Sequence, residues 1–141
     1  MALLLNPSFE AGVAPWQPEN IPNAVGLQTF TGGLPRSGSF VLAAQTNTPG
    51  GSFRQDFSSN ASSVFAFAWV RAWTTPVALT FAIWDLQPNT SIDANFTVTQ
   101  DWTFITNTKA LTNPGQARQV RFEIYIQTAF AYLLVDSANV F

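Results

Sequence analysis

The sequence predicts an all-β fold, a single β-sandwich jelly roll of roughly nine or ten antiparallel strands. Two-residue alternation recurs along the whole chain, and no stretch of about eleven or more residues has helical periodicity. Clusters of Gly, Pro, Asn and Ser separate the alternating segments at intervals of roughly 8 to 12 residues. A chain of 141 residues suffices for one core and is too short for two, so one domain should span residues 1–141.

The strongest alternation covers residues 64–73. Its large side consists of Phe65, Phe67, Trp69, Arg71 and Trp73. The other side carries only Val and Ala, and both sides are mostly apolar, which predicts a central strand covered on both faces. A second alternation over residues 77–84 follows the short break at residues 74–76, so the two segments are expected to pair as an antiparallel hairpin.

A third alternation, over residues 120–127, has one apolar side and one polar side, as expected of a strand with one face in water. Its polar side is where a ligand would be recognised. Weaker alternation predicts five more strands, at residues 25–31, 39–46, 52–57, 95–99 and 102–111.

The two ends of the chain, residues 5–12 and 133–141, are expected to be short apolar strands that lie side by side. Each carries one carboxylate, Glu10 and Asp136. Two carboxylates brought close together need a cation or a set of hydrogen-bond donors between them. Pairing of the ends therefore predicts a structural metal or, alternatively, backbone donors at this edge.

The composition excludes much of enzyme chemistry. The chain has no cysteine and no histidine, which rules out disulfides, thiolate nucleophiles, imidazole zinc sites and Ser-His triads. Charged residues make up only 10% of the chain, against about 25% in an ordinary soluble domain, and aromatic residues make up 14%. Two interpretations stay open: a neutral β surface rich in Thr, Asn and Gln, or a surface largely covered by neighbouring subunits.

The net charge of −2, without runs of either sign, argues against nucleic acid as a partner and against an electrostatically held membrane surface. The first residues lack a basic region and have a four-residue apolar run, so neither a signal peptide nor membrane insertion is expected there.

Six segments occur in an order that resembles the carbohydrate-binding modules of families 4, 9 and 22, within the galactose-binding-like jelly rolls. They are residues 6–10 (Asn-Pro-Ser-Phe-Glu) with Trp16, then 36–42, 52–57, 65–72, 102–104 and 132–136. Each segment is weak evidence alone, but together they span the whole chain. The resemblance implies a jelly roll that binds sugars without catalysing a reaction.

The resemblance also implies a structural Ca²⁺. Its ligands would be the side chains of Glu10 and Asp136 with backbone carbonyls of the 36–39 loop, which contains Ser37 and Ser39. Two carboxylates with carbonyls and water satisfy the six to eight oxygens that Ca²⁺ takes. The alternative without metal is that Glu10 caps a turn and Asp136 accepts backbone donors.

Sugar binding in this family relies on aromatic platforms with polar side chains beside them, and seven residues are candidates here. The aromatic candidates are Trp73, Trp84, Phe30 and Tyr125; the polar candidates are Gln127, Arg121 and Asp85. Core packing is the alternative for each aromatic residue. It is favoured for Trp69 and Trp73, and for Trp84 the two interpretations are equally supported.

Two functional hypotheses remain, both non-enzymatic, because the eight acidic residues form no recognisable catalytic motif. The first is a structural or adhesive assembly protein, such as a virion decoration, cement or fibre component at a virion or extracellular surface, with copies of itself or other virion proteins as partners. The alternative is a module that binds a plant or microbial polysaccharide, of β-glucan or xylan type, for a partner glycoside hydrolase. Composition favours the first, and resemblance favours the second.

Overall fold

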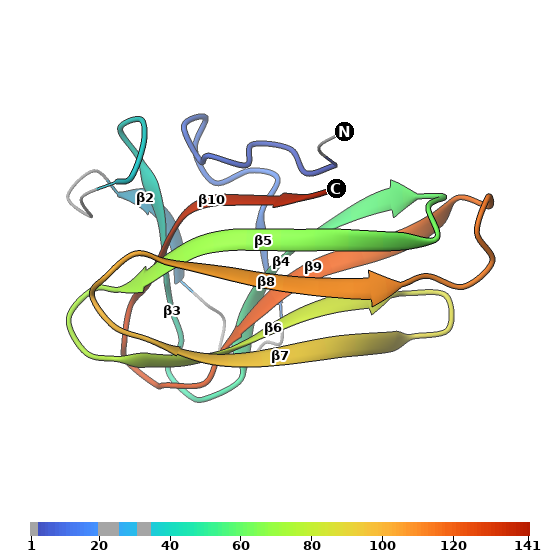
Figure 1. Ribbon diagram of the computed structural model, residues 1–141. Coiled ribbons are helices and arrows are strands. Elements are labelled where there is room, and N and C mark those ends of the chain that lie inside the picture. The colour runs from blue at the N-terminus through green and yellow to red at the C-terminus, as the bar shows by residue number, and fades with distance from the viewer. Residues whose placement is uncertain (1–2, 20–25, 31–34) are drawn as a thin grey trace.

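The computed structural model describes residues 3–19, 26–30 and 35–141 as two antiparallel sheets packed face to face (Figure 1). Sheet A has the order β1-β4-β9-β6-β7, with bounds Gln17–Glu19, Gly51–Ser59, Arg118–Ile126, Val77–Asp85 and Thr90–Val98. Sheet B has the order β2-β3-β10-β5-β8, with bounds Gly26–Phe30, Val41–Gln45, Leu133–Val140, Ser63–Ala72 and Thr103–Ala110. The predicted all-β sandwich is confirmed. Within the described residues, no helix is long and apolar enough to cross a membrane.

The core lies between the sheets and is dominated by large residues of sheet A and the N-terminal segment. Trp16 is its centre: its ring lies 5.3 Å from Phe9, 6.2 Å from Phe53 and 5.4 Å from Phe122, measured between ring centroids. Sheet B contributes small side chains from β5, all of them buried: Val64, Ala66, Ala68, Val70 and Ala72. The small side of β5 faces inward because the opposing aromatic rings already fill the space.

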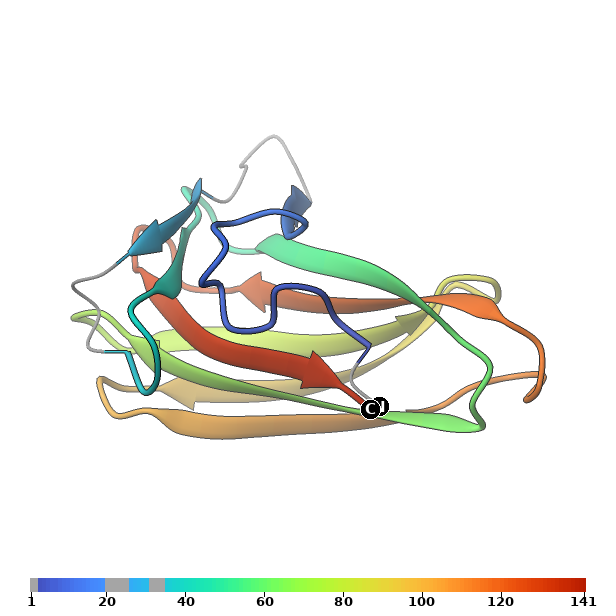
Figure 2. The same ribbon diagram turned by 90° about the horizontal axis from the view of Figure 1, so that it is seen from above.

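The N-terminal segment is not a strand, contrary to the prediction for residues 5–12. The side chain of Asn6 folds it into turns by donating to the carbonyls of Gly12 (2.7 Å) and Ala14 (3.1 Å). An asparagine side chain that bonds nearby backbone groups in this way competes with a strand ladder. The segment still lies beside β10 (Figures 1 and 2), where Leu3 N–H donates to the Val140 carbonyl at 2.9 Å.

The predicted hairpin between residues 64–73 and 77–84 is also wrong. β5 pairs with β10 and β8 in sheet B, whereas β6 pairs with β9 and β7 in sheet A. The break at residues 74–76 therefore crosses from one sheet to the other. It offers no Gly or Asn for the positive φ that tight hairpin turns require, while the β6–β7 turn contains Asn89 with φ of 55°.

β5 is a central strand, as predicted, but it is not covered on both faces. Its large side points outward from sheet B, and Phe65 is 41% exposed. Nothing in the described part of the chain forms a third layer over this face (Figure 2). The outer faces of the two sheets are thus the surfaces on which a function can be placed.

Candidate functional site

The outward side chains of sheet A form the surface we call the polar face, and strand register sets their rows. Across β9, Tyr125 lies opposite Ser52 of β4 and Thr80 of β6. One row along, Glu123 lies opposite Arg54 and Ala82; in the next row Arg121 lies opposite Asp56 and Trp84. Polar alternation in β9 therefore places a continuous band of polar groups on this sheet, beside the indole of Trp84.

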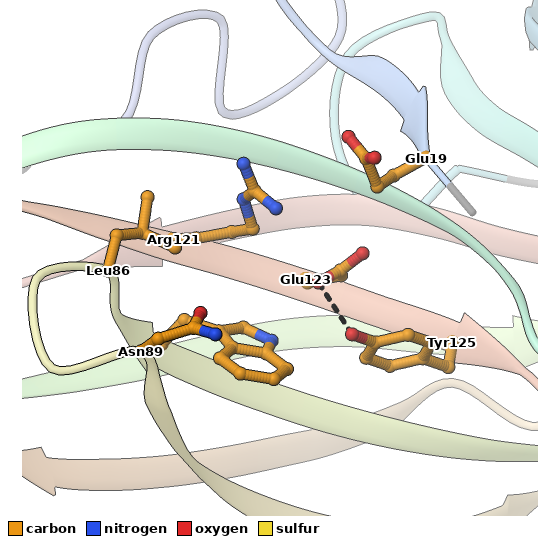
Figure 3. Close-up of a pocket in the computed structure, with 7 residues that line it drawn as sticks. Glu19, Leu86, Asn89, Arg121, Glu123 and Tyr125 are labelled. Atoms are coloured by element: carbon orange, nitrogen blue, oxygen red, sulfur yellow. Dashed lines mark hydrogen bonds between the residues drawn. The ribbon is translucent and has the colours of Figure 1, made fainter.

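A pocket of about 160 Å³ opens on the polar face (Figure 3). Strand β1 supplies one side chain to it, β6 and the following turn supply three, and β9 supplies three. The lining residues are Glu19, Trp84, Leu86, Asn89, Arg121, Glu123 and Tyr125.

Glu123 is the fixed acceptor of this pocket. It is 2% exposed, and each carboxylate oxygen accepts a hydroxyl: Ser52 Oγ donates at 2.6 Å and Tyr125 Oη at 2.8 Å. Figure 3 shows the Tyr125 hydroxyl aimed at the carboxylate. Burial and the hydrogen bond to Glu123 raise the pKa of Tyr125, so its hydroxyl stays protonated and keeps donating.

Both arginines of the polar face are held by carboxylates. Arg121 binds Asp56 through two nitrogens, at 2.7 and 3.1 Å, and this interaction raises the pKa of Arg121. Arg54 donates to the same carboxylate at 3.3 Å and forms an ion pair with Glu19. The guanidinium groups therefore fix the positions of the β1, β4 and β9 side chains.

Trp84 provides the aromatic surface of the pocket. Its indole N–H is buried and makes no hydrogen bond of normal geometry among the described residues, although it lies near the Tyr125 hydroxyl and acts to lower the pKa of that group. A buried donor without a partner costs free energy that a ligand acceptor can recover. Trp84 therefore offers a ring and a hydrogen bond to a bound molecule.

A second hollow, of about 310 Å³, lies along β6 and β7. Its polar wall is ordered, because Gln127 Nε2 donates to Thr80 Oγ1 at 3.2 Å and Thr80 Oγ1 donates to Asn95 at 2.7 Å. Thr80, which lines this hollow, is the cross-strand neighbour of Tyr125, which lines the first. Its lining is Ala78, Leu79, Thr80, Asn95, Phe96, Thr97 and Gln127.

The structure brings four of the seven predicted sugar-binding candidates onto this surface. Trp84, Tyr125 and Arg121 line the first pocket, and Gln127 lines the second.

The other three candidates lie elsewhere. Asp85 is fully buried, because it follows Trp84 on a strand and so points to the opposite face; there it binds Arg118 and Thr112. Trp73 packs on the outer side of sheet B. The backbone of Phe30 pairs with Val41 in β2 of sheet B, and the side chain of Phe30 lies outside the described part of the structure.

Sequence reasoning missed two important residues of the pocket. Glu123 shares the alternation of Arg121 and Tyr125, so that periodicity was a sufficient signal for it. Glu19 belongs to β1, a strand of three residues with too few positions to show any alternation.

The outer face of sheet B is aromatic. Phe67 stacks between Phe104 (5.4 Å between centroids) and Phe141 (5.9 Å), and Trp69 packs on Phe104 at 5.0 Å. The Arg36 guanidinium lies 3.7 Å from the Trp69 ring centroid. Core packing was favoured for Trp69, and this prediction is wrong, because Trp69 lies on an outer face. Trp73 packs in a small cluster outside the main core, with Val41, Ala43 and Leu134. We call these stacked rings of Trp69, Phe104, Phe67 and Phe141 the aromatic ladder.

The edge near the chain ends brings together the residues of the predicted metal site. Ser39 and Phe40 N–H groups donate to the two oxygens of Glu10 at 2.7 and 2.8 Å, and Ser37 N–H donates to Asp136 Oδ2 at 2.9 Å. These are the backbone donors of the metal-free alternative. Glycine is required at position 38, because the Cβ of any other residue would lie 2.5 Å from a Glu10 oxygen.

Asp136 nevertheless retains a free ligand atom. Its Oδ1 is buried without a hydrogen-bond partner among the described residues, and burial together with the nearby Glu10 charge raises its pKa. An orphaned carboxylate oxygen next to a second carboxylate suits a hard cation such as Ca²⁺. No cluster of three or more Asp, Glu, His or Cys occurs in the described ranges, so carbonyls and water would complete the shell.

Comparison with solved structures shows the fold to be that of carbohydrate-binding modules. TmCBM61, solved in complex with β-1,4-galactotriose, has 14% identity and a TM-score of 0.75 over 100% of this chain and 98% of its own. The CBM22-1 xylan-binding domain of Paenibacillus barcinonensis Xyn10C has 16% identity and a TM-score of 0.73, over 98% and 92%.

A tailspike protein of bacteriophage CBA120 also contains this fold. It has 14% identity and a TM-score of 0.68, and the match covers 97% of this chain and 21% of the tailspike domain. No protein-family profile and no curated protein sequence matches the chain.

Proposed function

We propose that the polar face of sheet A binds a glycan chain without catalysing its cleavage. The observation that carries the proposal is the first pocket, where the Trp84 indole with its unbonded N–H stands beside the fixed Glu123–Tyr125 pair. The carbohydrate-binding-module fold supports the same conclusion, although that likeness alone establishes only the architecture.

The chemistry of the pocket matches a pyranose. The apolar face of a sugar ring packs on an aromatic ring, while the sugar hydroxyls need acceptors and donors around its rim. Glu123 has its two oxygens held by hydroxyl donors, and the arginines are bound to carboxylates. These groups are therefore pre-organised for binding.

Native gel electrophoresis in gels that contain β-1,4-galactan, xylan or β-glucan tests the proposal. The protein should be retarded by at least one polymer, and the matching oligosaccharide should reverse the retardation. Unchanged mobility with all three polymers, together with no heat of binding for the matching oligosaccharides in calorimetry, would contradict glycan binding.

We also propose that Glu10 and Asp136 hold a structural Ca²⁺, with carbonyls of the 36–39 loop and water. The ion would neutralise the two carboxylates and fix the loop against β10. Ca²⁺ in excess should raise the melting temperature above that in EDTA by several degrees, since saturation at 100 Kd contributes about 2.7 kcal/mol. Glu10→Gln should abolish the difference; identical melting of the unmodified protein in both buffers would exclude the site.

Self-association through the outer face of sheet B is a second candidate function, because three aromatic rings are exposed on that face. Phe65, Phe104 and Phe141 are 41%, 45% and 49% exposed, in a chain with few charges. An assembly role at a virion or extracellular surface would use this face and leave sheet A free. Size-exclusion chromatography with light scattering should then show an oligomer that Phe104→Ser dissociates, whereas a monomer at high concentration would remove this candidate.

A further inference from the structure

The net charge of the protein is concentrated on the polar face. Four of the eight acidic residues belong to that face, with two of the six basic residues: Glu19, Asp56, Asp93 and Glu123, with Arg54 and Arg121. The remaining acidic and basic residues are equal in number and cancel: Glu10, Asp85, Asp101 and Asp136 against Arg36, Arg71, Lys109 and Arg118. The whole formal charge of −2 therefore lies on the surface proposed to bind glycans.

Asp93 is the carboxylate of this surface that is available to a ligand. It is exposed on β7, opposite Ala82, and accepts a hydrogen bond from Ser91 Oγ at 2.9 Å. Glu123 lies opposite the other side of Ala82, so only a methyl group stands between the two acidic side chains in this row. The Asp93 charge also acts at the pocket, because it raises the pKa of Tyr125.

The arginines of this face cannot serve an anionic ligand without breaking existing ion pairs. Arg121 is bound through two nitrogens to Asp56, and Arg54 is shared between Asp56 and Glu19. No arginine of the described chain hydrogen-bonds to Asp93 or Glu123 in the structure. A uronate or sulfate placed over the Ala82 row would meet two carboxylates and no unpaired cation.

We propose that this face, given that it binds glycans, takes neutral or amino-sugar chains and excludes uronate-bearing and sulfated chains. A protonated sugar amine would pair with Asp93 on β7, in the same row as Glu123 and across Ala82 from it. Selection here comes as much from repulsion of the wrong charge as from attraction of the right one.

Calorimetry with three oligosaccharides of equal length tests the proposal: β-1,4-linked glucose, β-1,4-linked glucosamine and a uronate oligomer. The unmodified protein should bind the glucosamine oligomer most tightly and the uronate oligomer most weakly. Asp93→Asn should weaken glucosamine binding roughly two- to fivefold, as expected for one exposed charge pair, and so lower the ratio of glucosamine affinity to glucose affinity. Asp101→Asn is the matched control, since it removes an exposed charge from the β7–β8 turn.

The outcomes separate this inference from the proposed function. Binding of all three oligomers with similar affinity, or the same ratios in Asp93→Asn as in the unmodified protein, would overturn charge selection and leave glycan binding standing. Binding of none would remove the glycan function and charge selection with it. Raising the salt concentration to about 1 M, where the Debye length is about 3 Å, should bring the three affinities together.

Discussion

The two outer faces of the sandwich use their aromatic residues in opposite ways. On sheet B, each ring of the aromatic ladder packs against a neighbour, and Phe67 has a ring on both sides. On sheet A, Trp84 forms no ring contact with another described aromatic residue and has an unbonded N–H. The rings of the ladder pack against one another, whereas the ring of Trp84 packs against no other described aromatic ring.

This difference shows that the number of aromatic residues on a strand does not identify a binding site. Strand β5 has the densest outward aromatic stripe of the chain, yet those rings are largely satisfied by each other and by Arg36. The pocket proposed to bind glycans instead has one isolated indole among hydrogen-bonded polar groups. A free ring face with nearby fixed donors and acceptors is the more informative feature.

The largest expected effect comes from breaking the support beneath the polar face. Asp85 and Arg118 form a buried ion pair at 3.2 Å that joins β6 to β9, the two strands that carry Trp84 and Tyr125. Asp85→Asn leaves the buried guanidinium of Arg118 without its counter-charge, so the free energy of unfolding at pH 7 should fall by about 3–5 kcal/mol. Urea denaturation measures this loss, and Asp101→Asn should show almost none.

The same ion pair predicts an acid-dependent stability. Burial alone would raise the pKa of Asp85, but hydrogen bonds from Thr112, Arg118 and Gln87 outweigh it and hold the pKa below its usual 3.8. The stabilisation is therefore complete above about pH 5 and is lost as the pH falls below about 4 through the folded-state pKa. The stability difference between the unmodified protein and Asp85→Asn should shrink over that range; a constant difference down to pH 2 would contradict the assignment.

Truncating one aromatic residue on each outer face gives the next largest effect. Trp84→Ala should weaken glycan binding by about 2 kcal/mol or roughly 30-fold, the usual cost of removing an aromatic anchor. Phe67→Ala should lower stability and leave glycan binding unchanged, since it removes two ring contacts worth about 0.5–1.5 kcal/mol each and touches no group of the polar face. Calorimetry and urea denaturation of both variants measure the two effects. Equal losses of binding in the two variants would erase the distinction between the faces.

The sequence predicted the fold and the centre of the site from the same kind of signal. Alternation over residues 120–127 defined β9 and placed Arg121, Tyr125 and Gln127 on one face, because a two-residue period fixes which side chains share a surface. Alternation cannot tell which face of a strand meets the other sheet when both faces are apolar. That is why the outward direction of Phe65 and Trp69 was missed.

Other features depended on partners that are distant in sequence. Asp85 was a candidate for the ligand surface, but it directly follows Trp84 on β6, and this one-residue step turns it to the opposite face. The N-terminal turns depend on Asn6, whose side chain competes with strand hydrogen bonds in a way that apolar patterning does not register. The connection between β5 and β6 depended on turn chemistry. Residues 74–76 contain no Gly or Asn, and this was the available signal that they do not form a tight hairpin turn.

The smallest expected effect compares the two tyrosines, one on each side of the molecule. Tyr125→Phe removes the hydroxyl that donates to Glu123 and leaves this buried carboxylate with Ser52 as its remaining hydroxyl donor, so stability should fall by about 1–2 kcal/mol. Tyr132, which is exposed beside Trp73 at the sheet B side, is the matched control, and its change to Phe should cost less than about 0.5 kcal/mol. Urea denaturation resolves the two values. If both variants lose the same stability, the Glu123 network does not stiffen the polar face, and the pre-organisation argued for the pocket would have to come from the arginine pairs alone.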